Sequence, residues 1–164
     1  MSMFEDRRYR WRETYFVLFH SRDRPKLKAV KQAIEALGEN YELRNPRADS
    51  QGRIESLTVV ASDDYSALDI CYTTGEDVLE QGASLGEEIR STARTSGRTA
   101  PVPAIEQFDA RFDVLHFEQI PEFPEDLDEE DILDPSALLL VLGALARLTG
   151  GVAVDPQSGA LLGD

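Results

Sequence analysis

The chain of 164 residues has one cysteine, Cys71, and two histidines, His20 and His116. A single cysteine excludes a disulfide framework within the chain, and two histidines could form a zinc site only together with carboxylate ligands. The sequence has neither of the glycine-rich patterns that bind phosphate, and it has no serine elbow flanked by glycines. It therefore lacks the signatures of nucleotide-binding proteins and serine hydrolases, and no cofactor or metal site is predicted.

Long apolar segments are also missing. The longest, ALLLVLGALA at residues 137–146, has about half the length that a bilayer-spanning helix needs, and it is followed by Arg147. The start MSMFEDRRYR lacks the apolar core and the cleavage pattern of a secretory signal. These features predict a cytoplasmic protein that does not contact a membrane.

Acidic residues, in contrast, are abundant and unevenly placed. The net charge is −14, and a composition with 41% hydrophobic and 29% charged residues is that of a globular protein. Residues 1–31 contain nine Lys or Arg and four Asp or Glu, whereas the remaining residues contain eight and 27. The overall negative field repels phosphate, so the composition disfavours nucleic acid as a partner.

Hydrophobic periodicity predicts one domain spanning residues 1–164. Strands are predicted at residues 14–20, 41–45, 53–62, 67–73 and 111–120, followed by a short hairpin about the turn DPQSG. Helices are predicted at residues 24–37, 75–93 and 135–149, the first capped by Asp23 and the third by Asp134. Residues 1–10 are expected to be a flexible N-terminus, and residues 94–104 and 121–134 to be loops.

The order of these elements indicates the α+β class. We predict a sandwich with a mixed, mostly antiparallel sheet, three helices and a ferredoxin-like, split βαβ character. The first strand, TYFVLFH, is apolar at consecutive positions, which predicts a place in the middle of the sheet with both faces covered. Because one helical layer leaves the second face bare, either the third helix or a second copy of the protein is expected to cover it.

Arginines alternate with aromatic residues just before this strand, at Arg7, Arg8, Arg10, Trp11 and Arg12. Proteins that bind single-stranded nucleic acid combine these two kinds of side chain. Alternation along a strand, however, puts the arginines and the rings on opposite faces, where they could not contact one ligand. A solvated or self-paired strand edge is the simpler interpretation, and an acidic segment of the same chain or of a second copy could supply the partner.

This acidic segment carries eight carboxylates within residues 122–134, among them Asp126, Asp128, Glu129 and Glu130. A calcium-binding loop that begins at Asp126 needs glycine at its sixth position and glutamate at its twelfth. The chain has Asp131 and Ala137 there. We therefore predict a solvated acidic run that docks on a basic surface, either the arginines near the N-terminus or a partner's.

A second candidate site follows the first strand. His20, Ser21, Arg22 and Arg24 lie where the strand leads into the first helix, and the N–H groups at a helix start attract anions. His116 shares its predicted strand face with Glu118, so a carboxylate could orient its imidazole, but no nucleophile accompanies the pair. In the competing interpretation, these residues are structural and the arginines face solvent.

The leading hypothesis is a small acidic protein that is not an enzyme and acts through protein–protein contact, as an adaptor, regulator or inhibitor. A second copy in a homodimer is a candidate partner. The hypothesis follows from the missing catalytic signatures, the uneven charge and a sheet that needs cover on both faces. The alternative is a small-molecule or anion-binding protein, or a minor enzyme, with its site at His20–Arg24 and His116. Nucleic-acid binding through residues 7–12 is a third hypothesis.

Overall fold

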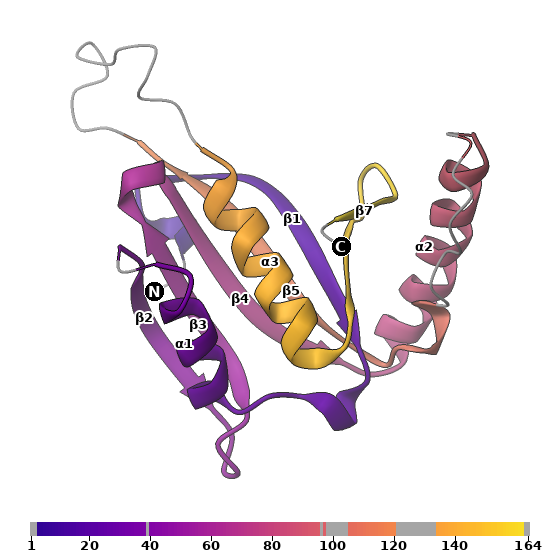
Figure 1. Cartoon of the computed structure of the whole chain (residues 1–164), viewed down its shortest axis with the longest axis horizontal. Coiled ribbons are helices and arrows are strands. Elements are labelled where there is room, and N and C mark those ends of the chain that lie inside the picture. The colour runs from indigo at the N-terminus through magenta and orange to yellow at the C-terminus, as the bar shows by residue number, and fades with distance from the viewer. Residues whose placement is uncertain (1–2, 39, 96, 98–104, 121–133, 163–164) are drawn as a thin grey trace.

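The computed structural model describes residues 3–38, 40–95, 97, 105–120 and 134–162 (Figure 1). The strands in these residues are β1 (Tyr9–Phe19), β2 (Glu42–Ala48), β3 (Ile54–Ala61), β4 (Ser66–Thr74), β5 (Ala110–Gln119), β6 (Val152–Asp155) and β7 (Ala160–Leu162). The α-helices are α1 (Leu27–Glu35), α2 (Glu76–Thr95) and α3 (Ser136–Thr149). Short 3₁₀ turns are η1 (Met3–Glu5), η2 (Ser21–Asp23), η3 (Ser62–Asp64) and η4 (Ile105–Gln107).

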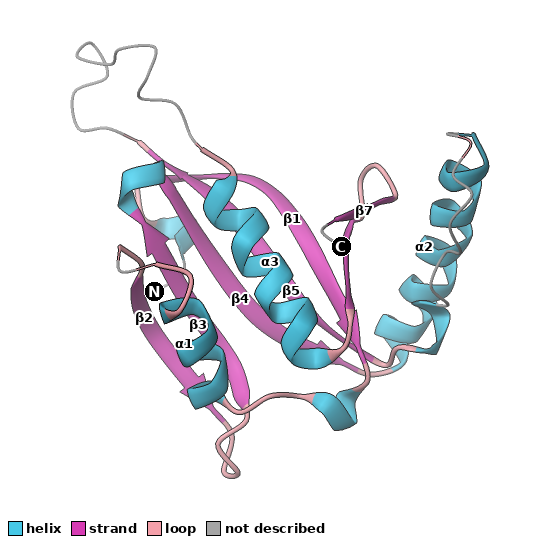
Figure 2. Ribbon diagram, in the orientation of Figure 1, coloured by secondary structure: helices cyan, strands magenta, loops and turns pink. Residues whose placement is uncertain are grey.

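The seven described strands form one open sheet in the order β2-β3-β4-β5-β1-β6-β7, and every pairing is antiparallel. The predicted α+β class is therefore confirmed. The ferredoxin-like, split βαβ character is not confirmed, because three strands, β3, β4 and β5, lie between β1 and β2. The predicted sandwich is not confirmed either. Figure 2 shows a single sheet with α1 and α3 in front of it and α2 beside it, and the side chains of α2 pack on the face opposite α1 and α3.

Helices α1 and α3 cover one face of this sheet (Figure 1). Val17 and Phe19 of β1 pack there with Ile34 of α1 and Leu142 of α3, and all four side chains are fully buried or nearly so. On the opposite face, Leu18 packs with Leu85 and Ile89 of α2 and with Ile105 of η4. The strand thus buries consecutive residues in two separate cores, as its continuous apolar run predicts.

The central place of β1 is confirmed, because β5 and β6 flank it. The strand starts at Tyr9, so it is longer than predicted and reaches into the stretch that we expected to be flexible. The predicted cap at Asp23 is wrong. Residues 21–23 form η2, and α1 begins only at Leu27, after a bridge between Lys26 and Arg53 has tied this segment to β3.

Helix α2 begins close to the predicted residue and extends to Thr95, so residues 94 and 95 are helical. The four-residue spacing of Gly82 and Gly86 places both on one face of the helix, which predicts that a sheet or another helix approaches closely there. The close neighbour is instead η4. The Ile105 carbonyl oxygen lies 3.6 Å from the position of a Cβ on Gly82, and a Cβ on Gly86 would lie 2.6 Å from Glu106 Oε1.

Helix α3 begins at Ser136, one residue later than predicted, with Pro135 at the N-cap position, and it ends at Thr149 as predicted. The Asp134 carboxylate accepts a hydrogen bond from the Ser136 amide at 2.9 Å, and Gly150 ends the helix with a φ of 64°. The sequence of α3 is apolar on nearly every side, which predicts extensive burial, but one side of the helix is exposed. Leu139 and Leu140 are 50% and 46% exposed, because α3 has the sheet on one side and solvent on the other.

Candidate interaction surface

The arginines near the N-terminus are paired within the chain. Arg8 forms a salt bridge with Asp6 at 2.7 Å, and Glu118 accepts contacts from Arg10 at 2.7 Å and from Arg12 at 3.4 Å. Arg7 is exposed. Asp126, Asp128, Glu129 and Glu130 lie outside the described residues. The carboxylates that meet these arginines are thus those of a neighbouring turn and of β5.

The register of β1 and β5 separates the arginines from the rings. Arg10 pairs with Glu118, whereas Trp11 pairs with Phe117 on the other face, and a bulge follows Trp11. The Trp11 indole N–H donates to Thr14 Oγ1 at 3.2 Å, and the side chain stays 42% exposed. This agrees with the separation expected from the alternation for Arg10 and Trp11, whereas the Arg8 guanidinium lies 5.8 Å from the centroid of the neighbouring Tyr9 ring, which is itself buried.

The predicted anion site at His20–Arg24 already contains a carboxylate of the chain. The Ser21 amide and hydroxyl both donate to Asp109, at 2.7 and 2.6 Å, and these bonds lower the pKa of Asp109. The ring of His20 contacts Phe108 edge-on, with centroids 4.9 Å apart. Asp109 therefore occupies the position that a bound anion was expected to take.

Arg24 points away from this carboxylate. Its Nε donates to the Ile54 carbonyl at 2.8 Å, NH1 lies 3.2 Å from Asp49, and the guanidinium stacks 4.0 Å from the Tyr72 ring centroid. Arg22 is exposed. Residues 20–25 therefore connect the β1–α1 segment to its neighbours, through the Arg24 contact with β3 and the Ser21 contact with Asp109 before β5. Their side chains do not converge on a pocket.

His116 is 1% exposed, and its neighbours differ from the predicted ones. Its Nε2 lies 2.9 Å from Ser66 Oγ, and its Nδ1 lies 3.8 Å from Glu13 and has no hydrogen-bond partner in the described part of the chain. Burial lowers the pKa of His116. Glu118 binds the arginines instead, and about 20 Å of β5 separates His116 from the end of the strand near His20.

Ser66 and Glu13 were missed by the sequence analysis. Catalytic triads consist of a serine, a histidine and a carboxylate that contact one another in this order, and Ser66, His116 and Glu13 are arranged in the same order. Here Ser66 has no exposed surface, and the distance between His116 and Glu13 exceeds that of a hydrogen bond. A substrate has no access to this hydroxyl, so the cluster is a buried polar contact between β4, β5 and β1. Finding it required the strand register, which no local motif encodes.

The sheet face opposite α1 and α3 is only partly covered. Helix α2 lies beside the β6–β7 hairpin, at one side of the sheet (Figure 1). Between α2 and Trp11, half-buried side chains of β1, β4 and β5 form a surface that we call the open face, consisting of Thr14, Asp69, Cys71, Asp113 and Leu115. Among the described residues, no α-helix covers this surface, and beyond Leu115 the η1 turn packs on the same face, with the Phe4 ring centroid 5.1 Å from that of Phe117.

Side chains of the open face are held in place by hydrogen bonds. Thr58 donates to Asp69 at 2.6 Å, and Arg111 donates to Asp113 at 2.6 Å. Burial, with help from Asp69 and Asp113, raises the pKa of Cys71 to about 11, so its thiol is protonated at neutral pH and is a weak nucleophile. Hydrogen bonds thus fix the acidic side chains of the open face, and its one thiol is not a reactive nucleophile.

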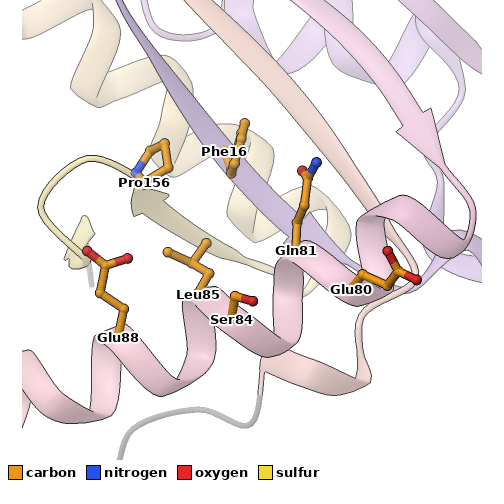
Figure 3. Close-up of a pocket in the computed structure, with 7 residues that line it drawn as sticks. All are labelled: Phe16, Glu80, Gln81, Ser84, Leu85, Glu88 and Pro156. Carbon is orange, nitrogen blue, oxygen red and sulfur yellow. The ribbon is translucent and has the colours of Figure 1, made fainter.

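A groove of about 450 Å³ continues the open face between α2 and β1, and we call it the α2 groove. In Figure 3, Leu85 and Gln81 point from α2 toward Phe16 of β1, and Pro156 of the β6–β7 turn closes one end. Ser84, Glu80 and Glu88 complete its lining. Arg111 joins it to the open face, since its guanidinium stacks 4.1 Å from the Phe16 centroid and donates to Gln81.

In the described part of the chain, no group of three or more His, Cys, Asp or Glu side chains is arranged to hold a metal ion. None of the helices described is both long enough and apolar enough to cross a membrane. Comparisons with known proteins gave no match to a family model, to a curated protein or to a solved structure.

Proposed function

We propose that this chain is a protein-interaction module and not an enzyme, and that it binds a basic partner protein across the open face and the α2 groove. The observation that carries the proposal is the unequal cover of the sheet. Two α-helices bury one face, whereas the described residues cover the other face only at its ends, with α2 at one end and η1 at the other. A cytoplasmic location stays part of the proposal and is supported by the lone, half-buried Cys71.

The composition of this surface supports a protein partner. Trp11 is a large exposed aromatic side chain at one end of the open face, and tryptophan is among the residues that contribute most to binding energy in interfaces. Phe16 and Leu85 provide apolar area in the groove at the other end. The net charge of −14 attracts a basic partner and speeds its approach.

The alternative of an anion-binding protein at His20–Arg24 has less support. Asp109 occupies the donors of Ser21, and Arg24 is bound to Ile54 and Asp49. A homodimer through the arginines has less support as well, because Arg8, Arg10 and Arg12 meet carboxylates of the same chain. A separate protein with a basic surface is therefore the partner that we propose.

The test compares two exposed apolar side chains on opposite sides of the sheet. Tagged wild-type protein and the variants Trp11→Ala and Leu140→Ala are incubated with lysate of the source organism, and captured proteins are quantified by mass spectrometry. We expect a basic protein to be captured by the wild type and by Leu140→Ala. Trp11→Ala is expected to reduce its capture by about tenfold or more.

Three results would contradict the proposal. Capture of no protein would remove its main support, and capture that Trp11→Ala leaves unchanged would show that the open face is not the docking surface. A partner lost only with Leu140→Ala would assign binding to the exposed side of α3 instead. Circular dichroism of both variants checks that each keeps the fold.

A further inference from the structure

The α2 groove has an apolar floor and an acidic rim. Phe16, Leu85 and Pro156 supply the floor, and they come from β1, α2 and the β6–β7 turn. Phe16 and Pro156 are half-buried, so part of this apolar surface faces solvent. A volume of about 450 Å³ lies within the range of clefts that bind small ligands or a few side chains of a peptide.

The rim charges lie at the two ends of the groove. Glu88 is beside the turn that carries Pro156, and Glu80 is at the opposite end, where the groove meets the start of α2 (Figure 3). They are two helical turns apart, which corresponds to about 12 Å along the helix axis. Both side chains are exposed, and they belong to one line of residues on α2 that also includes Ser84.

The chain does not neutralise these two carboxylates. Within residues 3–38, 40–95, 97, 105–120 and 134–162, neither Glu80 nor Glu88 forms a salt bridge. The nearby cations are used elsewhere, since Arg111 pairs with Asp113 and Arg90 with Glu106. Helix α2 as a whole carries five acidic and two basic side chains. The rim therefore presents uncompensated negative charge on both sides of an apolar floor.

We infer that the α2 groove binds an extended segment of a partner protein in which a bulky apolar residue lies between two Lys or Arg residues. This inference rests on the proposed function and identifies the kind of segment that would occupy the groove. In an extended chain, residues i, i+2 and i+4 point to the same side, and i and i+4 lie about 13 Å apart. A basic, any, apolar, any, basic pattern thus places its cations near Glu80 and Glu88 and its apolar side chain on the floor.

The probe is a phage library of randomised peptides, selected on the full-length wild-type protein and then synthesised for fluorescence polarisation measurements. We expect the selected peptides to share the pattern of two basic residues around an apolar one. The double variant Glu80→Gln/Glu88→Gln is expected to weaken their binding by about tenfold, because it removes both rim charges. Ser84→Arg, which places a bulky cation in the groove from an exposed position, is expected to abolish binding.

The matched control is Glu55→Gln/Glu87→Gln, which removes the same net charge from exposed positions that do not line the groove. Its effect is expected to stay below about twofold, since exposed charges act weakly at a distance in salt. Three results would overturn the inference. Both double variants could weaken binding equally, the selected peptides could lack basic residues, or no peptide could be selected at all. If a host protein is still captured through Trp11 in any of these cases, protein binding at the open face stands and only the part played by the groove is lost.

Discussion

Ser21 donates two hydrogen bonds to Asp109, one from its backbone amide at 2.7 Å and one from its hydroxyl at 2.6 Å. The contact ties the end of β1 to the start of β5, two segments far apart in the sequence. Hydrogen bonds to a charged acceptor are stronger than those between neutral groups. A position that looked suited to a bound anion is thus a structural contact.

Replacing Asp109 by asparagine tests this contact. We expect Asp109→Asn to lower the free energy of unfolding by about 1–2 kcal/mol at neutral pH, measured by urea denaturation. The pKa of Asp109 is lowered from 3.8 in the folded state, so its stabilisation is complete above pH 3.8 and is lost as the pH falls through the folded-state pKa. The difference between wild type and variant should therefore disappear in strong acid. Asp23→Asn, in the adjacent exposed turn, is the control and should change little.

Gly151 is a position where the fold has no room for a side chain. A Cβ there would lie 2.1 Å from the Leu18 carbonyl oxygen and 2.9 Å from the Cβ of Phe19. We expect Gly151→Ala to destabilise the protein by about 3 kcal/mol or to prevent folding, because the backbone of β1 would have to move. Gly38→Ala is the matched control, since its Cβ would meet Tyr41 at an ordinary 3.5 Å. Equal stability of the two variants in thermal denaturation would contradict this account of the α3–β6 corner.

His116 should make the stability of the protein depend on pH. Its pKa is lowered from 6.5 by burial, so the unfolded chain binds a proton more readily than the folded one. The stabilising effect is complete above pH 6.5 and declines as the pH falls toward the folded-state pKa. An NMR titration of the ring should give a midpoint below 6.5. Glu13→Gln should lower it further, because the Glu13 charge favours the protonated ring. A midpoint at or above 6.5 would contradict the conclusion that burial outweighs the Glu13 charge in setting this pKa.

The paired arginines predict a solution mass that does not depend on salt. Because Glu118 contacts both Arg10 and Arg12 within the chain, these side chains are not free to hold a second copy together. We expect light scattering to give the same mass at low and high salt, and the same mass for Arg10→Gln/Arg12→Gln as for wild type. A dimer that dissociates with salt or with this double substitution would show that the arginines form intersubunit contacts instead.

Features encoded by local sequence were predicted well. The buried run at Val17, Leu18 and Phe19, the stop of α3 at Gly150 and the turn at residues 155–159 depend on neighbours in the sequence, so their patterns identify them. Leu139 and Leu140 show the limit of this approach. Their apolar character predicts burial, but only the position of α3 on the sheet decides which side of the helix meets solvent.

Features that depend on strand pairing could not be predicted. Glu118 meets Arg10 and Arg12, and His116 meets Glu13, because β1 and β5 pair with a bulge after Trp11. A different register would exchange these partners. The α2 groove is likewise invisible in the sequence, since Phe16, Leu85 and Pro156 belong to three elements that approach each other only in the folded chain.

The central position of β1 has a consequence for how the protein is made. Its two neighbours in the sheet begin at Ala110 and Val152, far along the chain. At a synthesis rate of about 5–20 residues per second, the apolar segment around Val17 waits on the order of ten seconds for its first neighbouring strand. During this time β1 has no neighbouring strand to pair with, although Val17 and Phe19 can already pack against α1. Folding of the sheet must therefore wait for late residues and depends on contacts between distant segments, which form slowly. The nascent chain is consequently a candidate for chaperone binding at this strand.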